Sequence, residues 1–371
     1  MCGRQGTGPY GLFIAVDGAG GKRGVLYAWV TSAKSLPNGQ RVLSLIVCRL
    51  HRLFASQIKG LSSFMRFDKN AIVDFIFRGI IGFARLFGYR ARVRVFAFIA
   101  SYVVAPLAGF INKAVVNLQL VHPEMPKAEA RKIAHCVAAN FGKNMIENYS
   151  KLDVAAGLNP ENIGGSGYDA MMQAVKNGRP VMLVSGHIGN YEAMRIALYT
   201  LGHQSACLYR PASNPYFDEH YTQTYGYLTG PAFPQSRKGF LNFTRYLRDG
   251  GIATMLFDVR TLQYGDIDFL GHPAPTSDVP AKIALKTGAL FVPCFAHRGP
   301  DGMTHHIEFE TPIEASTAEE MMIEMTRRLE AQVRRFPDQW LWFHDRWGSE
   351  THRTERAKQK LQPVDHSDLA Q

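Results

Sequence analysis

A histidine and a glutamate five positions apart are the residues of this chain best suited to chemistry. His187 and Glu192 follow the apolar run 181–184, which predicts a short buried strand that ends before Gly186. Asn190 is suited to capping a helix, and Glu192 would then lie in its first turn. A carboxylate bound to one imidazole nitrogen fixes the tautomer and leaves the other nitrogen as a base. This spacing would allow His187 to act as a general base and Glu192 to orient it.

Other interpretations of this segment must be weighed. His187 could be an ordinary loop histidine, and Glu192 a charge that favours the helix dipole. The segment lacks the second histidine four residues away on one helix that a zincin needs. Ser185 is not in a nucleophile elbow, because Leu183 and His187 stand where that motif requires glycine. Spacing alone does not choose between a catalytic pair and a structural turn.

A wider resemblance favours the catalytic interpretation. The stretch His187-Ile-Gly-Asn-Tyr-Glu192 resembles the His-x4-Glu motif of the lipid A biosynthesis acyltransferases, within the lysophospholipid acyltransferase superfamily. Five further blocks resemble that family in the same order, over about residues 70 to 348: 209–216, 250–258, 269–276, 287–293 and 337–347. Two departures stand out: Tyr191 replaces the usual tryptophan, and Val259 replaces a common glutamine after Asp258.

The resemblance implies an acyl transfer from the thioester of acyl carrier protein to a hydroxyl of a lipid A precursor. It implies no cofactor, no metal site and a place on the cytoplasmic face of a bacterial inner membrane. The alternatives are another lipid acceptor, such as a lysophospholipid, an amino-acid lipid or a glycolipid, with coenzyme A as donor, or a non-catalytic membrane-binding homologue. Besides the catalytic residues His187 and Glu192, the substrate-binding candidates are Gly189, Asn190, Arg210, Arg237, Asp258, Gly271 and Thr276.

Four of the substrate-binding candidates have a structural alternative. Gly189 and Asn190 could stabilise an oxyanion or only shape the turn. Arg210 could bind a phosphate or form a structural ion pair. Arg237 belongs to a basic pair that could attract a phosphate or simply be solvated. The block 271–276 reads as a loop at the border of the site.

Composition limits the class of protein. The 371 residues carry a formal net charge of +11, and 46% of them are hydrophobic, which supports a large core and favours an anionic partner. No nucleic-acid-binding signature is present, so anionic lipid and acyl carrier protein are the better candidates. The five cysteines are scattered without a Cys-x-x-Cys pair, as is typical of a reducing compartment: Cys2, Cys48, Cys136, Cys207 and Cys294.

The chain divides into four regions by character. Residues 1–64 are basic and match no family block, so we expect a disordered extension, a transit peptide, or a start that truly lies at Met65. Residues 65–125 are expected to form a membrane-associated helical region, 126–350 an α/β acyltransferase domain, and 351–371 a polar tail.

The region 65–125 is the candidate for membrane attachment. Residues 71–87 predict an amphipathic helix, and 95–111 are uncharged but slightly short for a span. Where these segments meet, residues 85–94 contain four arginines and no acid, which suits anionic headgroups: Arg85, Arg90, Arg92 and Arg94. The alternatives are two core helices under the sheet, or one true span.

The rest of the chain alternates between helix and strand, after a helix predicted over 127–150. We predict an α/β fold with a layered, mostly parallel sheet flanked by helices, and with His187 at the carboxyl end of a strand, where sites in such sheets lie. The predicted strands are 181–185, 205–209, 252–257, 290–296 and 305–310. The predicted helices are 168–176, 191–201, 215–227, 239–248, 277–286 and 317–336.

Overall fold

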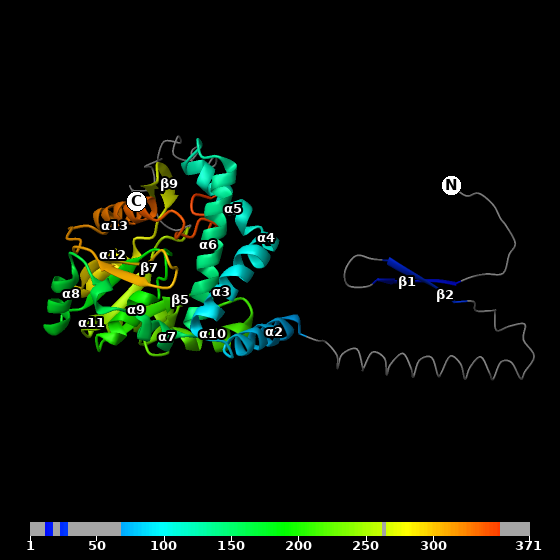
Figure 1. Cartoon of the computed structure of the whole chain (residues 1–371), viewed down its shortest axis with the longest axis horizontal. Coiled ribbons are helices and arrows are strands. Elements are labelled where there is room, and N and C mark those ends of the chain that lie inside the picture. Colours follow the sequence, from blue (N-terminus) through cyan, green and yellow to red (C-terminus); the bar gives the residue numbers. More distant parts are fainter. Residues whose placement is uncertain (1–11, 18–22, 29–67, 262–264, 349–371) are drawn as a thin grey trace, which may run out of the picture. The chain divides into compact units, whose positions relative to one another are not determined.

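The computed structural model describes residues 12–17, 23–28, 68–261 and 265–348. The chain separates into two compact units, Met1–Lys69 and Asn70–Gln371 (Figure 1). In the first unit, β1 (Leu12–Asp17) pairs antiparallel with β2 (Arg23–Ala28) as a hairpin, where the sequence suggested no element. The rest of the expected extension and the tail at 351–371 lie outside the described residues.

The second unit is built around a seven-stranded sheet in the order β3-β11-β10-β4-β7-β5-β6. All neighbouring strands are parallel except the antiparallel pair of β10 and β11. The strands are β3 (Ile163–Gly164), β4 (Val181–Ser185), β5 (Ser205–Tyr209), β6 (Ala232–Pro234), β7 (Ile252–Leu256), β10 (Leu290–Arg298) and β11 (His305–Phe309). The mixed α/β class with a mostly parallel sheet is confirmed.

Helices cover both faces of the sheet, which explains why β4 is buried throughout. Val181 and Leu183 face the core under α8 (Tyr168–Lys176) and α9 (Ala193–Thr200). Met182 and Val184 face the opposite core. That core lies under α11 (Arg237–Arg248), α12 (Val279–Thr287) and α13 (Ala318–Arg335). A strand buried on both sides is apolar at every position, as this sequence is.

Shorter elements complete the domain. They are α7 (Lys151–Gly157), the 3-10 turn Pro160–Asn162, α10 (Pro215–Gly226), and a hairpin of β8 (Asp266–Phe269) and β9 (His272–Pro275). The hairpin corrects the loop expected at 271–276. Leu270 and Gly271 form its turn with positive φ values of 55° and 80°, a conformation that suits a two-residue hairpin connection.

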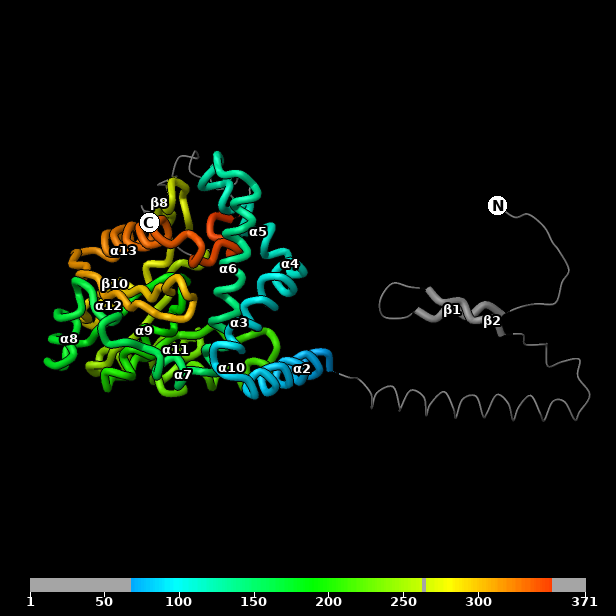
Figure 2. Tube along the Cα trace, viewed as in Figure 1, coloured from blue at the N-terminus to red at the C-terminus, as the bar shows by residue number. Residues whose placement is uncertain are grey.

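The helical region packs on the long helix α6 (Lys127–Asn148) rather than under the sheet. It contains α2 (Lys69–Ala84), α3 (Tyr89–Ile99), a π-helical turn (Ala100–Val104), α4 (Ala105–Leu107) and α5 (Phe110–Val121). Gly142 of α6 allows the close approach, since a Cβ there would lie 2.5 Å from the Phe96 carbonyl oxygen. These helices lie on one side of the domain, away from α8 and α11 (Figures 1 and 2).

The outer side of these helices is unusually apolar. Large side chains on it are half or more exposed, including Phe75 at 78%, Phe83 at 63% and Leu107 at 85%. Within the described residues, no single helix has the length and hydropathy needed to cross a bilayer. The segments Tyr89–Leu107 and Phe110–Val121 meet that test only as a pair bent by 84°.

Candidate active site

His187 lies two residues beyond β4, in a turn at the carboxyl edge of the sheet. The neighbouring strand β7 ends in register with β4, because Ser185 lies opposite Leu256. Continuing both chains by two residues brings His187 beside Asp258. The parallel pairing of two strands therefore joins residues that are 71 positions apart in the sequence.

Asp258 is the carboxylate that holds the His187 ring. Its Oδ1 lies 2.7 Å from His187 Nδ1, and its Oδ2 accepts a hydrogen bond of 2.7 Å from the His187 backbone N–H. The indole N–H of Trp340 donates to the same Oδ2 at 2.9 Å. Asp258 is 2% exposed and His187 is 22% exposed at the side chain. The ring is thus fixed from the buried side and open on the other.

Electrostatics keep Asp258 ionised. Burial alone would raise the pKa of this carboxyl, but the charge of His187 and the hydrogen bonds from His187 and Trp340 lower it to about 2. An ionised carboxylate only accepts hydrogen bonds, so the proton in this contact belongs to His187 Nδ1. The Nε2 of the neutral ring then carries the lone pair, which is the arrangement a general base needs.

Two glycines allow the turn to pack this tightly. Gly189 has φ of +55°, and a Cβ there would lie 2.0 Å from the Ala296 carbonyl oxygen. A Cβ on Gly186 would lie 2.9 Å from Asp258 Oδ2 and 2.6 Å from a Leu329 methyl carbon. Any side chain at either position would displace the histidine turn or its carboxylate.

The C-terminal segment 339–341 clamps the turn from outside. Leu341 donates its backbone N–H to the His187 carbonyl at 3.1 Å, and Gly189 donates to the Gln339 carbonyl at 3.1 Å. Ile188 forms an antiparallel bridge with Trp340. The tryptophans here are packing residues, each 1% exposed: Trp340, Trp342 and Trp347. Trp340 also fixes Asp258, so packing and site geometry depend on one side chain.

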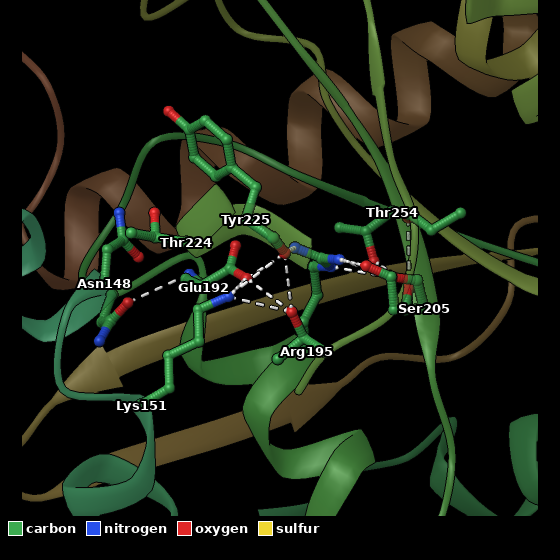
Figure 3. Close-up of polar contacts among 12 residues, drawn as sticks. Asn148, Lys151, Glu192, Arg195, Ser205, Thr224, Tyr225 and Thr254 are labelled. Atoms are coloured by element: carbon green, nitrogen blue, oxygen red, sulfur yellow. Dashed lines mark hydrogen bonds and ion pairs between the residues drawn. The ribbon is translucent and has the colours of Figure 1, made fainter. Parts of the chain in front are cut away.

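Glu192 is held elsewhere, which corrects the expected pairing with His187. Its Oε1 accepts hydrogen bonds from Lys151 Nζ at 2.7 Å, from Arg195 Nη1 at 2.6 Å and from Thr229 Oγ1 at 3.2 Å (Figure 3). Lys151, Glu192 and Arg195 are all buried. Glu192 is the N-cap residue immediately before α9, and its carboxylate is directed toward Lys151 of α7 rather than across the turn toward His187.

The charges of this cluster stabilise one another. Burial alone would raise the Glu192 pKa, but Arg195 and Lys151 lower it below its usual range. Burial lowers the pKa of Lys151, and Glu192 opposes that shift. Arg195 also donates to the Ser205 carbonyl at 3.0 and 2.7 Å. Glu192 therefore ties α7, α9 and the start of β5 together behind the histidine turn.

A second buried cluster holds Asn190 and Gly189. Asn190 is 1% exposed and donates its amide to Glu147 Oε2 at 2.9 Å. Asn144 donates to the Gly189 carbonyl at 2.7 Å. Arg298 forms a bidentate pair with Glu147 that holds the cluster together. These contacts fit turn residues, and the Asn190 amide is directed at Glu147 rather than at the open side of His187.

A comparison with protein families decides the class of this site. The model for the bacterial lipid A biosynthesis acyltransferases matches residues 62–349. The chain belongs to this family. It is therefore an acyltransferase, and the family acts on a lipid acceptor. A comparison with curated proteins found no match.

The four remaining substrate-binding candidates fall into two groups by their surroundings. Arg210 and Arg237 are exposed, and they follow β5 and β6 at the same carboxyl edge as His187. Gly271 and Thr276 belong to the β8–β9 hairpin and its exit. Gly271 donates to Asp268 Oδ1 at 3.1 Å at the turn, and Thr276 Oγ1 accepts from the buried Arg346 at 2.5 Å. Both hairpin residues thus have structural partners.

Sequence reasoning placed Asp258 among the substrate-binding residues and missed its part in holding the histidine. The signal was present: Asp258 directly follows the predicted strand 252–257, and His187 follows the predicted strand 181–185 by two positions. What the sequence lacked was the knowledge that these two strands are neighbours in the sheet.

A small hollow lies against the open side of His187. It measures about 20 Å³ and is lined by α6, the histidine turn and the 339–341 segment. Its walls include Phe141, Asn144, Tyr191 and Leu341. A volume of this size admits about one water molecule.

Proposed function

We propose that this acyltransferase moves a fatty acyl chain from the thioester of acyl carrier protein to a hydroxyl of a lipid A precursor. The observation that carries the proposal is the His187–Asp258 pair at the carboxyl edge of the sheet, with Nε2 on the open side of the ring. Family membership supports the acyl chemistry, and the net charge of +11 suits an acidic carrier and a phosphorylated lipid.

The reaction needs no covalent enzyme intermediate. His187 Nε2 takes the proton from the acceptor hydroxyl as its oxygen attacks the thioester carbonyl. The carbon–sulfur bond then breaks, and the imidazolium returns its proton to the departing thiolate. The ionised Asp258 stabilises the imidazolium between these two steps. General-base assistance of this kind contributes about 10²–10⁴ in rate.

Substrate entry requires the hollow beside His187 to widen. Its volume of about 20 Å³ cannot contain an acyl chain. Phe141 and Leu341 line it, so side-chain movement at α6 and at segment 339–341 would open it. Arg210 and Arg237, exposed at the same edge, are suited to binding the phosphates of either substrate.

The apolar outer side of α2–α5 supports attachment to a bilayer, which is where the lipid acceptor is found. Its exposed aromatic and aliphatic side chains would insert at the level of the headgroups. The arginine cluster contributes less than its sequence suggests. Arg92 is buried and paired with Asp153. Arg90 and Arg94 are exposed and suited to facing anionic lipid, although Arg90 is also close enough to Asp301 to lower the pKa of that carboxyl. We place the enzyme on the cytoplasmic face of a bacterial inner membrane, with no cofactor.

An assay with purified protein tests the proposal. Acyl carrier protein and coenzyme A, each loaded with the same chain, are offered with a panel of acceptors that includes a lipid A precursor, a lysophospholipid, an amino-acid lipid and a glycolipid. We expect transfer from the carrier protein to the lipid A precursor. Faster transfer to another acceptor would replace the substrate, and no transfer to any acceptor would refute the proposal.

A further inference from the structure

A basic groove separates α11 and α12 on the outer face of the domain. The two helices pack side by side over the sheet and enclose a groove of about 550 Å³. Its floor is apolar and includes Phe240, Leu241, Val279 and Ile283. Leu241 is 60% exposed. Apart from Arg237 at one end of the groove, the proposed reaction does not use this surface.

Positive charge lines the groove. No described residue that lines the groove is acidic, and five are basic and exposed: Arg237, Arg245, Arg248, Lys282 and Lys286. Two carboxylates beside the groove bind lining cations. Asp278 Oδ2 lies 2.8 Å from Lys282 Nζ, and Asp249 Oδ1 lies 3.6 Å from Arg248 Nε. These two carboxylates offset only part of the charge of the five basic residues. The groove therefore keeps a strong excess of positive charge over an apolar floor.

The groove leads toward the active site. α11 ends at Arg248 just before β7, and α12 ends at Thr287 just before β10, so both helices run antiparallel to these strands. Arg248 and Lys286 therefore lie toward the amino edge of the sheet. Arg237 and Val279, the first residues of the two helices, lie toward the carboxyl edge, where His187 is found. At about 1.5 Å per residue, α11 gives the groove a length of about 18 Å.

The shape and position of the groove favour a protein over a membrane as its occupant. In the view of Figures 1 and 2, α2–α5 lie at the right of the domain, and α11 and α12 lie to the left of them. A bilayer against the outer side of α2–α5 would therefore lie away from the groove. A helix with one acidic and one apolar face would fill a concave, apolar-floored channel and match its cations.

We propose that the α11–α12 groove docks an acidic amphipathic helix of the protein that carries the acyl thioester. The proposal rests on the proposed function and identifies the surface that receives its donor. Docking there would place one end of the carrier's helix at the carboxyl edge of the sheet and direct the thioester toward His187. Charges of this kind govern association more than chemistry, so their loss should appear in KM and in salt dependence.

The test compares charge reversal inside and outside the groove in the full chain. Arg245→Glu with Lys286→Glu reverses two groove charges, each near the carboxyl end of a helix. Lys176→Glu with Arg334→Glu is the matched control, because each lies in the last turn of α8 or α13, outside the groove. KM and kcat are measured with the same acyl chain on acyl carrier protein and on coenzyme A.

Binding of unloaded carrier protein is measured separately by fluorescence anisotropy, and melting curves check that each variant folds. Arg245→Gln with Lys286→Gln serves if the reversal variant does not fold.

We expect the groove variant to raise KM for the carrier-bound donor about tenfold, which corresponds to about 1.4 kcal/mol of binding free energy. In the groove variant, kcat with the carrier-bound donor and KM for the coenzyme A donor should stay within about twofold of wild type. In the control variant, both kinetic constants should stay within about twofold for both donors. This is the result expected when only the encounter with the carrier protein is affected. Unchanged KM and carrier binding would overturn the proposal. An equal rise in KM for the carrier protein donor and the coenzyme A donor would also overturn it. So would a groove variant that keeps its binding to the carrier protein but loses its binding to anionic vesicles.

Carrier binding separates this proposal from the proposed function. If the wild type transfers no acyl group but binds the carrier through the groove, the proposed reaction fails and the docking surface stands. If the wild type transfers acyl groups and the groove variant binds the carrier normally, the docking surface fails and the reaction stands.

Discussion

At the scale of single residues, Asp258 decides whether His187 can serve as a base. The Asp258 carboxylate accepts hydrogen bonds from His187 Nδ1, from the His187 backbone N–H and from the Trp340 indole N–H. These contacts fix both the ring position and the proton on Nδ1. The two residues thus form one unit, and removing the charge of Asp258 should affect the chemistry of His187 more than substrate binding.

Asp258→Asn should lower kcat by about 10²–10⁴ with a small change in KM, because an amide can donate to Nδ1 and leave the proton on Nε2. Steady-state kinetics with the carrier-bound donor would measure this. Trp340→Phe is a useful comparison, since it removes one hydrogen bond to Asp258 and keeps the charge. An Asp258→Asn variant with wild-type kcat would show that the carboxylate is only structural.

Acid should weaken the fold through the same residue. The folded pKa of Asp258 is about 2, below its ordinary value of 3.8, so the ionised form stabilises the fold. That stabilisation is present above about pH 4 and is lost as the pH falls through 2, and it amounts to about 2 kcal/mol. Urea unfolding of wild type and Asp258→Asn should show a difference in unfolding free energy that narrows below pH 4. A difference independent of pH would contradict the assignment.

At the scale of elements, the site depends on which strands are neighbours. The sequence predicted the main strands, most of the helices and the position of His187 at a strand end. It did not predict that β7 lies beside β4, because strand order depends on pairing between distant segments rather than on local pattern. The short strand β6 was missed because Ala-Phe-Pro gives no alternation, and β8–β9 because prolines suggested a loop.

The helix start at Glu192 explains why the expected pair was wrong. Spacing suggested that His187 and Glu192 could converge, but the two buried cations Lys151 and Arg195 come from α7 and α9. A buried carboxylate binds the nearest buried cations, since an unpaired charge in the core is costly. Nothing near 187–192 in the sequence points to Lys151.

Glu192→Gln should therefore destabilise the protein by about 3–5 kcal/mol, because Lys151 and Arg195 would be buried without their counter-ion. Chemical denaturation would measure the loss. Glu324→Gln, which breaks two partly exposed ion pairs on α13, with Arg327 and Arg328, should cost less than about 1 kcal/mol for each pair. If Glu192→Gln keeps wild-type stability and loses only turnover, the carboxylate acts on the reaction rather than on the fold.

At the scale of the whole molecule, two surfaces of different chemistry suit the two partners that we propose. The apolar side of α2–α5 suits a bilayer, and the basic α11–α12 groove suits an acidic protein. An enzyme that takes its acyl group from a carrier in solution and its acceptor from a membrane needs both. In this proposal the acyl donor and the lipid acceptor meet at the carboxyl edge of the sheet, beside His187.

Replacing Phe75, Phe83 and Leu107 by serine should weaken vesicle binding strongly at any salt concentration, because insertion of apolar side chains does not depend on charge. Replacing Arg90 and Arg94 by glutamine should weaken it by about 1 kcal/mol per charge, at low salt only. Sedimentation with anionic vesicles would distinguish the two. Full binding by the serine variant would place the membrane contact elsewhere.

The central claim, that His187 is the general base of acyl transfer, is tested most directly by the single-turnover rate of His187→Ala with pre-bound acyl carrier protein donor and lipid A precursor. Because His187 is partly exposed and its partner Asp258 retains Trp340, the variant should fold. We predict a rate at least about 10²-fold below wild type, with substrate affinities nearly unchanged. A folded His187→Ala protein that transfers the acyl group at close to the wild-type rate would contradict the account.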